Sequence, residues 1–354
     1  MNILYFLWRG GIGGGEKVVL NLVNGLNSKK FNTKICVWIK EDAPLKEICK
    51  KQGIEYIELN GENKFKLSTF RELIKVIKTN KIDLVHSHGV VAKFFGTIAT
   101  KFTKAKSIIT IHRLTTDRKA HHKVLNTISI LLSNKVICVS KAVENGLSKI
   151  EKIIYNLKTK AIIYNGLDIE NIERLSSEPI EIQKDKNKIY LLFVGRLDPI
   201  KGVDYLIKAM KLIVEVDDKY RLLIVGDGED KKRLQSLTNE LNLNKYIEFK
   251  GHQNNVYKYM RFCDVLVNPS FTEGFPLVIL EALTNNLFII TTCVGGISEI
   301  LCDYEYKKYI PIKSCESIAC EVLNCKFEVE YKAEINKFKI ENMIEEHIKF
   351  YNKK

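Results

Sequence analysis

Two acidic residues and a helix start in the second half of the chain could together hold a ligand. In NPSFTEGFPLVILEAL, residues 268–283, Glu273 comes just before an apolar helical run and Glu281 lies within it. Gly274 lets backbone approach a ligand closely, and Pro276 suits the first position of a helix. The free N–H groups of such a helix start attract anions, although an acid placed there can simply cap the helix.

Two cations stand in a separate loop, VGRLDPIKG, residues 194–202. Arg196 and Lys201 follow an apolar run that is typical of a buried strand. There they could neutralise a diphosphate, Arg196 through its planar fork and Lys201 as a point charge. The alternative is that both side chains are merely solvated.

The third feature is a glycine loop, GGIGGGEKVV, residues 10–19, directly after the first apolar run. It fails the Gly-x-Gly-x-x-Gly dinucleotide pattern in both registers. A tight turn would explain one glycine but hardly Gly13, Gly14 and Gly15 together, so the loop favours close approach of a ligand to a helix start.

The cysteines do not indicate a metal site. Nine are present, with no Cys-x-x-Cys pair, and the spacing of Cys315, Cys320 and Cys325 fits no usual ligand pattern. There is also no Asp-x-Asp motif. We therefore expect no metal and no resident cofactor, and reduced thiols that are mostly buried.

Short apolar runs alternate with amphipathic stretches along the chain, which predicts βαβ units and parallel sheets. The predicted strands are residues 2–8, 33–39, 54–59, 82–87, 107–112, 135–140, 161–164, 189–195, 220–226, 246–249, 264–270 and 287–292. The fold class is α/β with two doubly wound, Rossmann-like domains, and ligands of such sheets bind at the carboxyl ends of the strands.

The polar stretch 176–188 reads as a linker. It predicts an N-terminal domain over 1–172, a C-terminal domain over 173–333 and a closing helix within 334–354.

The charge is distributed unevenly. Residues 1–172 hold 29 Lys and Arg against 14 Asp and Glu, whereas residues 173–354 hold 27 against 28. A basic first domain suggests an anionic surface or substrate. No apolar run nears the roughly 18 residues that span a bilayer, and no signal peptide is evident, so we expect a cytoplasmic protein unless it binds a membrane face.

Taken together, the motifs resemble the retaining GT-B glycosyltransferases of family 4. They follow the family's order along nearly the whole chain: the glycine loop with Glu16, TIHR 110–113, VICVS 136–140, IYNGLD 163–168, VGRLDPIKG 194–202, LLIVGDGE 222–229, DVLVNPSFTEGFPLVILEAL 264–283 and VGGISEI 294–300. The segment 285–290 departs from it, since the usual glycine and proline are missing; Asn285 or Asn286 can end the helix in the left-handed region instead.

The resemblance implies two domains facing a cleft, transfer from a nucleotide-diphosphate sugar with retention of configuration, and no metal. By it, Arg196 and Lys201 hold the diphosphate, Glu273 the donor-sugar hydroxyls and Glu281 the ribose. Backbone at Gly274, Phe275 and Pro276, together with Gly13, Gly14 and Gly15, completes the donor site.

The resemblance also places His112 where the family has a residue that touches the donor sugar. His112 would orient and polarise that sugar rather than act as a nucleophile. His86 and His88 also end a predicted strand and are weaker candidates.

The acceptor is less defined. Segment 64–78 has an apolar stripe beside Lys64, Lys66, Arg71, Lys75 and Lys78, which favours a lipid-linked or cell-surface glycan precursor and peripheral binding to the inner face of an anionic membrane. The stripe can equally pack on the sheet.

Two alternatives remain, a nucleotide-sugar isomerase on the same fold and a non-catalytic basic membrane-binding protein. No motif indicates nucleic acid.

Overall fold

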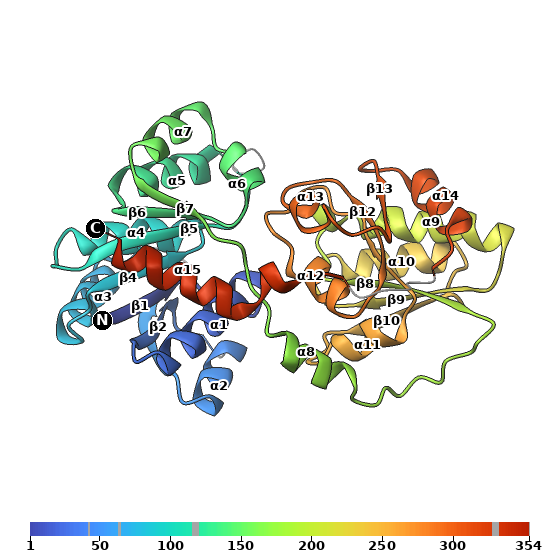
Figure 1. Ribbon diagram of the computed structural model, residues 1–354, viewed down its shortest axis with the longest axis horizontal. Helices are drawn as coiled ribbons and strands as arrows, with labels where there is room; N and C mark the ends of the chain where they lie inside the picture. The colour runs from blue at the N-terminus through green and yellow to red at the C-terminus, as the bar shows by residue number, and fades with distance from the viewer. Residues whose placement is uncertain (42, 63–64, 115–119, 328–332, 354) are drawn as a thin grey trace. The chain divides into compact units, whose positions relative to one another are not determined.

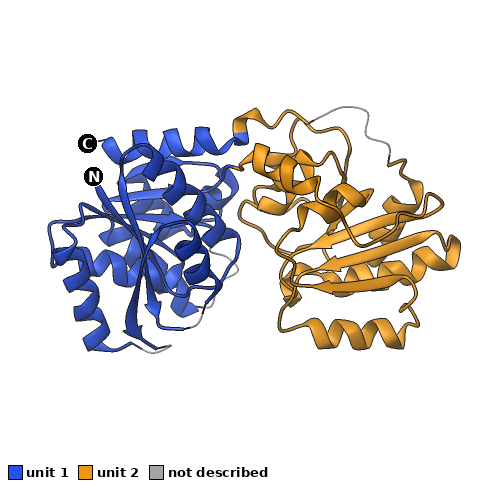
Figure 2. Ribbon diagram, turned by 90° about the horizontal axis from the view of Figure 1, so that it is seen from below, with its two compact units in different colours: residues 1–166, 338–354 blue, residues 167–337 orange. Residues whose placement is uncertain are grey.

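A computed structural model describes residues 1–41, 43–62, 65–114, 120–327 and 333–353. The chain forms two compact units, unit 1 with residues 1–166 and 338–354 and unit 2 with residues 167–337 (Figure 2).

Within its described residues, unit 1 is built on a seven-stranded parallel sheet with the order β3-β2-β1-β4-β5-β6-β7 (Figure 1). The strands are β1 Asn2–Leu7, β2 Asn32–Ile39, β3 Glu55–Gly61, β4 Leu84–His88, β5 Lys106–Ile111, β6 Lys135–Cys138 and β7 Thr159–Ile162. The helices are α1 Gly14–Ser28, α2 Pro44–Lys51, α3 Leu67–Thr79, α4 Val90–Thr100, α5 Ala120–Leu132, α6 Lys141–Asn145, α7 Lys149–Asn156 and α15 Ile340–Asn352. The central strands are almost entirely buried because helices cover both sides of such a sheet.

Unit 2 has a six-stranded parallel sheet in its described part, with the order β10-β9-β8-β11-β12-β13. Its strands are β8 Ile189–Val194, β9 Tyr220–Val225, β10 Ile247–Gly251, β11 Val265–Asn268, β12 Phe288–Thr292 and β13 Lys307–Ile310. Its helices are α8 Ile169–Ser176, α9 Val203–Val216, α10 Lys231–Glu240, α11 Tyr257–Phe262, α12 Leu277–Thr284, α13 Ile297–Ile300 and α14 Cys315–Asn324; short 3₁₀ helices are η1 Pro199–Lys201 and, at the unit boundary, η2 Asn336–Phe338.

In both sheets the chain reverses the direction in which strands are added. In unit 1 this switch lies between β1 and β4, and in unit 2 between β8 and β11. Loops that leave two such strands diverge to opposite faces of the sheet, which opens a ligand-binding crevice at the carboxyl ends.

The predicted fold class is confirmed: all twelve predicted strands are present. The additional strand β13 escaped prediction because its KKYI sequence exposes two of four residues at a sheet edge. The expected linker 176–188 lies inside unit 2, and the division falls at residues 166 and 167 rather than after residue 172.

The closing helix α15 belongs to unit 1, where it packs against α1. A Cβ on Gly25 of α1 would lie 2.0 Å from Ile344 Cδ1, so a larger residue there would have to displace the Ile344 side chain. The buried Lys135 ammonium donates to the carbonyl oxygens of Phe350 and Tyr351 at 2.8 and 3.1 Å and thereby caps the helix C-terminus.

Two smaller expectations are revised. Only four cysteines are buried, namely Cys36, Cys49, Cys138 and Cys263, so the expectation of mostly buried thiols was wrong. Among the described residues, none of the helices combines the length and apolar character needed to cross a membrane.

Candidate functional site

The loops that follow β8 and β11, at the switch point of unit 2, bring Lys201 and Glu273 together. Lys201 Nζ lies 2.6 Å from Glu273 Oε1, and the two side chains are 21% and 10% exposed. Seventy-two residues separate this pair in the sequence, but the adjacent strands end side by side.

Local hydrogen bonds hold these two loops against each other. Asp198 caps η1 by accepting from the Ile200 N–H at 3.2 Å, and the Phe271 N–H donates to the Ile200 carbonyl at 2.8 Å. Gly202 is left-handed, with φ of 66°, and a Cβ there would lie 2.4 Å from the Pro269 carbonyl oxygen. The position of Lys201 is thus fixed by backbone contacts on both sides.

Arg196 lies in the same loop but is oriented differently. Its side chain is 57% exposed, and its guanidinium pairs with Asp198 at 2.9 Å. The two cations predicted from the sequence therefore share one loop; Lys201 is half-buried against Glu273 and Arg196 is accessible.

The segment after Glu273 leads into α12. Gly274, Phe275 and Pro276 are all buried, and the Gly296 N–H donates to the Gly274 carbonyl at 2.8 Å. Pro276 is the N-cap, with ψ of 117°, and not the first helical residue as the sequence predicted. The extended ψ of Pro276 starts the helix one residue later.

Glu281 is buried on α12, and the Tyr257 hydroxyl of α11 donates to its carboxylate at 3.3 Å. Burial and the Glu281 charge raise the pKa of Tyr257, which keeps the phenol a donor. Sequence analysis missed Tyr257, because no local pattern links it to the motif. The helix ends with Asn285 as C-cap and Asn286 at φ of 54°, so the predicted left-handed ending is confirmed at Asn286.

The glycine loop of unit 1 makes Gly13 the N-cap of α1, with Gly14 and Gly15 in its first turn. The Glu16 carboxylate accepts from the Gly13 N–H at 3.1 Å, as in a capping box. A Cβ on Gly15 would meet open space. An anion at this helix start would therefore have to share the amides with Glu16.

His112 follows β5 of unit 1, and its Nε2 lies 2.8 Å from Nδ1 of His88, the last residue of β4. The register pairs His88 with Thr110, so the histidine that ends β4 and the one that follows β5 meet at the carboxyl ends of these two strands. His86 instead contacts Thr110 and Tyr351 at 2.7 and 2.8 Å. His88 is therefore a neighbour of the predicted site residue His112. Its position at the end of the adjacent strand is the sequence feature that could have predicted this contact.

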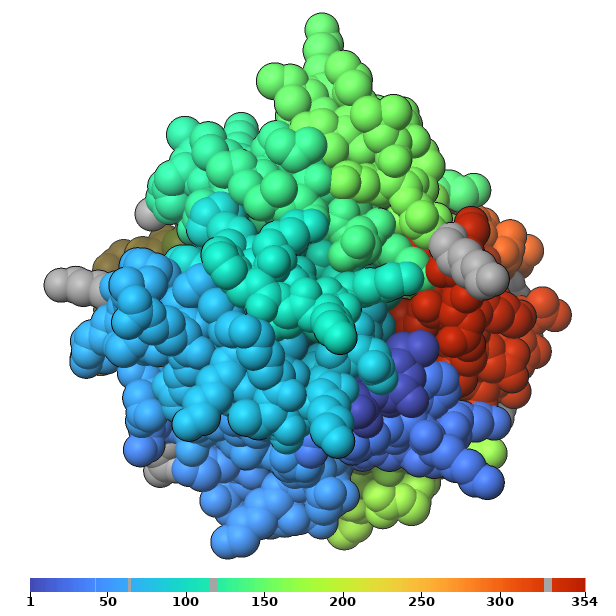
Figure 3. Space-filling view, turned by 90° about the vertical axis from the view of Figure 1, so that its left-hand side faces the viewer, coloured from blue at the N-terminus to red at the C-terminus, as the bar shows by residue number. Residues whose placement is uncertain are grey.

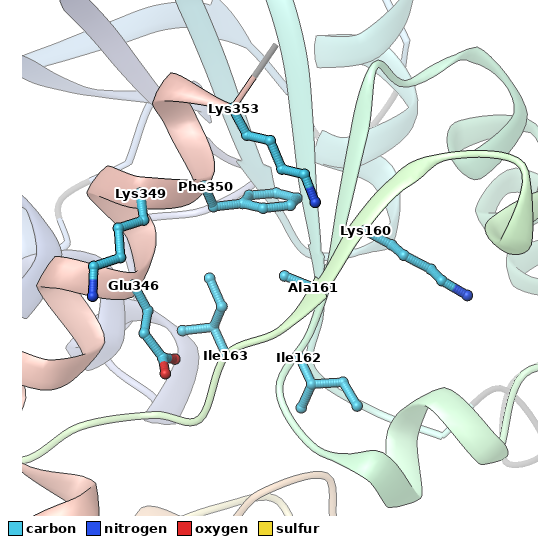
Figure 4. Close-up of a pocket in the computed structure, with 8 residues that line it drawn as sticks. All are labelled: Lys160, Ala161, Ile162, Ile163, Glu346, Lys349, Phe350 and Lys353. Atoms are coloured by element: carbon cyan, nitrogen blue, oxygen red, sulfur yellow. The ribbon is translucent and has the colours of Figure 1, made fainter.

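A cavity of about 240 Å³ opens elsewhere in unit 1, between the edge strand β7 and α15 (Figure 4). Figure 4 shows the Phe350 ring and the side chains of Ile162 and Ile163 among its lining. It contains none of the predicted site residues.

Comparison with known proteins identifies the class. A family model for glycosyl transferases group 1 matches residues 176–324, and a second, for glycosyltransferase family 4, matches residues 12–171. With these two matches and the doubly wound fold of both units, the chain belongs to the GT-B glycosyltransferases.

Three proteins illustrate the similarity. The uncharacterized glycosyltransferase MJ1059 of Methanocaldococcus jannaschii is 38% identical over 43% of this chain, and the match spans only 39% of that relative. The N-acetylgalactosamine-N,N'-diacetylbacillosaminyl-diphospho-undecaprenol 4-alpha-N-acetylgalactosaminyltransferase of Campylobacter jejuni is 28% identical, over 88% of this chain and 87% of that enzyme. The crystal structure of Anabaena Alr3699/HepE in complex with UDP and glucose has a TM-score of 0.83 and 17% identity, with 99% of each chain covered.

The first prediction concerns Gly295, which has φ of 59° and whose Cβ would lie 1.9 Å from the Glu273 carbonyl oxygen. Gly295→Ala should lower the free energy of unfolding by about 2–4 kcal/mol, since strain in the left-handed region and overpacking add. Gly251→Ala is the control, because Gly251 has φ of 64° but meets only Lys231 Nζ at 3.9 Å; it should cost about 1 kcal/mol. Equal losses in urea denaturation would contradict the close approach to Glu273.

The second prediction concerns acid stability. Burial lowers the pKa of His347 to about 4 and holds the pKa values of His86 and His88 well below their usual range. Repulsion from neighbouring histidines adds to this for both His86 and His88, and Lys93 adds to it for His88. Between about pH 6.5 and 4 the unfolded chain then binds more protons than the folded one. The free energy of unfolding should therefore fall as pH drops through this window, by up to about 1.4 kcal/mol per pH unit for each histidine.

Urea denaturation from pH 7.5 to 5 measures this slope. His347→Asn keeps a donor for the Met343 carbonyl, which His347 Nδ1 contacts at 2.8 Å, and should flatten the slope. The exposed His252 supplies the control, His252→Gln. A slope that stays unchanged in His347→Asn would refute the assignment.

Proposed function

We propose that the protein transfers a sugar from a nucleotide-diphosphate sugar to a lipid-linked or cell-surface glycan precursor, with retention of configuration and without a metal. The observation that carries this proposal is the Lys201–Glu273 pair at the switch point of unit 2. Membership of the GT-B glycosyltransferases supports the reaction class. Anabaena HepE, which has the same fold, was crystallised with UDP and glucose.

Each residue has a role in this proposal. The accessible Arg196 guanidinium and the Lys201 ammonium bind the diphosphate, and Glu273 accepts from donor-sugar hydroxyls. Lys201 carries three N–H donors, so it can keep Glu273 and still contact a phosphate oxygen. Glu281, held by Tyr257, binds the ribose hydroxyls, and backbone at Gly274, Phe275 and Pro276 surrounds the phosphates.

The chemistry requires stabilisation of negative charge as the bond between sugar and diphosphate breaks. Fixed cations and amides provide this stabilisation while the sugar carbon becomes oxocarbenium-like. Glu273 is bound to Lys201, which suits a carboxylate that orients hydroxyls and disfavours a nucleophilic role. From unit 1, His112, oriented by His88, polarises the donor sugar, and Gly13, Gly14 and Gly15 contribute backbone to donor binding.

The charge distribution motivates the acceptor class. Residues 1–172 have an excess of cations, and the Campylobacter relative is named for transfer onto a diphospho-undecaprenol-linked sugar. We extend that substrate class to this chain, with a cytoplasmic protein that binds peripherally to the inner face of an anionic membrane.

The third prediction tests the reaction. UDP-glucose, UDP-galactose, UDP-N-acetylglucosamine and GDP-mannose are screened by thermal shift; a ligand at 100 times its Kd stabilises by about 2.7 kcal/mol. The donor found should be consumed, by transfer or slow hydrolysis, equally well with EDTA. Loss of activity in EDTA with recovery in Mg²⁺ or Mn²⁺ would contradict metal independence. Conversion of the donor alone into an isomer would favour the isomerase, and no consumption of any donor would favour a binding protein.

The fourth prediction tests the site. Lys201→Ala and Glu273→Gln should each lower turnover by about 10²–10³-fold, since each removes a group that stabilises the reacting donor. Lys184→Ala is the control, because Lys184 pairs with Asp264 at 2.7 Å directly before β11, at the amino end of the strand whose carboxyl end leads to Glu273. Circular dichroism should show all three variants folded. Turnover of Lys201→Ala equal to that of Lys184→Ala would remove Lys201 from the site.

A further inference from the structure

Helix α7 of unit 1 exposes two of its three isoleucines to solvent. Ile150 and Ile153 are each 65% exposed, and Leu157, which directly follows the helix, is 82% exposed. Spacings of three and four residues place the three side chains on one face. Glu151, by contrast, is completely buried. Tyr155, four residues after Glu151, is also buried, so the helix buries one aromatic and one charged residue while it exposes an aliphatic stripe.

A buried polar network determines that orientation. Glu151 accepts from Asn126 Nδ2 of α5 at 2.6 Å and from the Ser148 N–H at 2.9 Å. Asn126 in turn accepts from the ammonium of Lys93 on α4, and both residues are buried. Rotating α7 to bury its isoleucines would remove Glu151 from these partners and expose the carboxylate to solvent. The outward apolar stripe is thus a fixed feature of unit 1.

The exposed apolar surface continues onto neighbouring elements. Helix α5 packs on α7 and exposes Val124 and Leu131, seven residues apart. Lys158 Nζ donates to the Leu131 carbonyl at 2.6 Å, which brings the end of α7 beside the end of α5. We call this surface the α5–α7 patch; it comprises Val124, Leu131, Ile150, Ile153 and Leu157 with Lys123, Lys149, Lys152 and Lys158.

The charge of the patch has one sign. Residues 120–132 and 148–158 contain a single acid, the buried Glu151, against the four lysines. Figure 3 shows the green segment that includes α7 projecting from this end of unit 1. Exposed aliphatic side chains interspersed with cations, and without anions, match the interface of an anionic bilayer.

Helix α3, which the sequence favoured for this role, differs. It buries its stripe, Phe70, Leu73 and Ile77, against the core and exposes Arg71, Lys75 and Lys78. Lys64 lies outside the described residues. The alternative that this stripe packs on the sheet while the cations face outward is therefore confirmed for α3, although Phe65 and Leu67 at its start are 53% and 54% exposed.

We propose that the α5–α7 patch docks unit 1 on an anionic lipid bilayer, with the lysines at the headgroups and Ile150, Ile153 and Leu157 inserted at the interface. This inference rests on the membrane part of the proposed function. A second copy of the chain fits less well, because a symmetric contact would set the same four lysines against each other.

The fifth prediction uses co-sedimentation with vesicles of phosphatidylcholine, with and without phosphatidylglycerol, at low salt. The wild type should bind the anionic vesicles. The triple variant I150Q/I153Q/L157Q should reduce the partition coefficient roughly tenfold or more, since exposed aliphatic area can no longer insert. L212Q/V216Q on α9 of unit 2 is the control, because both side chains are also exposed there, and it should bind like the wild type.

A third variant, K66Q/R71Q/K75Q/K78Q, measures the contribution of α3 and should weaken binding less than the triple variant does. Binding of the triple variant that equals wild type overturns the proposal, as does a wild type that ignores anionic vesicles. A dimer in light scattering that the triple variant converts to a monomer, without vesicle binding, would assign the patch to a second copy. A thermal-shift assay with the sugar donor distinguishes failure of membrane docking from failure of glycosyl transfer, because the donor should stabilise all variants equally.

Discussion

The parallel pairing of β8 with β11 is the constraint on which the candidate site depends. Val265 and Leu266 lie beside Leu191 and Leu192 in this ladder, so the loops after both strands emerge at one edge. Because strands are added in opposite directions from this pair, neither loop is covered by the crossover of the other. The Lys201–Glu273 contact follows from that topology, and the backbone contact of Gly202 with Pro269 fixes its geometry.

Unit 1 repeats the arrangement with different chemistry. Its switch lies between β1 and β4, and the carboxyl ends of β4 and β5 supply the His88–His112 pair instead of an ion pair. Next to this pair, His86 contacts Tyr351 of α15, whose hydroxyl lies 2.9 Å from that of Tyr5. The last helix thus attaches through buried hydrogen bonds to the strands that end at the histidines, which couples the end of the chain to the candidate site.

Buried polar groups also determine which side chains of α7 lie on the surface of unit 1. Glu151, Asn126 and Lys93 satisfy one another between helices, because a buried charge without partners is costly. These bonds, together with the burial of Tyr155 on the same face of α7, keep Ile150 and Ile153 at the surface. A glycosyltransferase whose acceptor is held in a bilayer would gain from such a surface, since docking concentrates it at its substrate.

The sequence by itself determined the features that depend on local patterns. Apolar periodicity located the strands up to β12, and positions after strand ends marked Lys201 and Glu273, because parallel strands align their carboxyl ends whatever the intervening chain. The family resemblance singled out His112. Tertiary structure alone decided the Tyr257–Glu281 bond, the place of α15 in unit 1 and the outward turn of α7. Each of these features depends on contacts between residues that are distant in sequence. An amphipathic pattern predicts that a helix has two different faces, but which face is buried depends on the elements that pack against it.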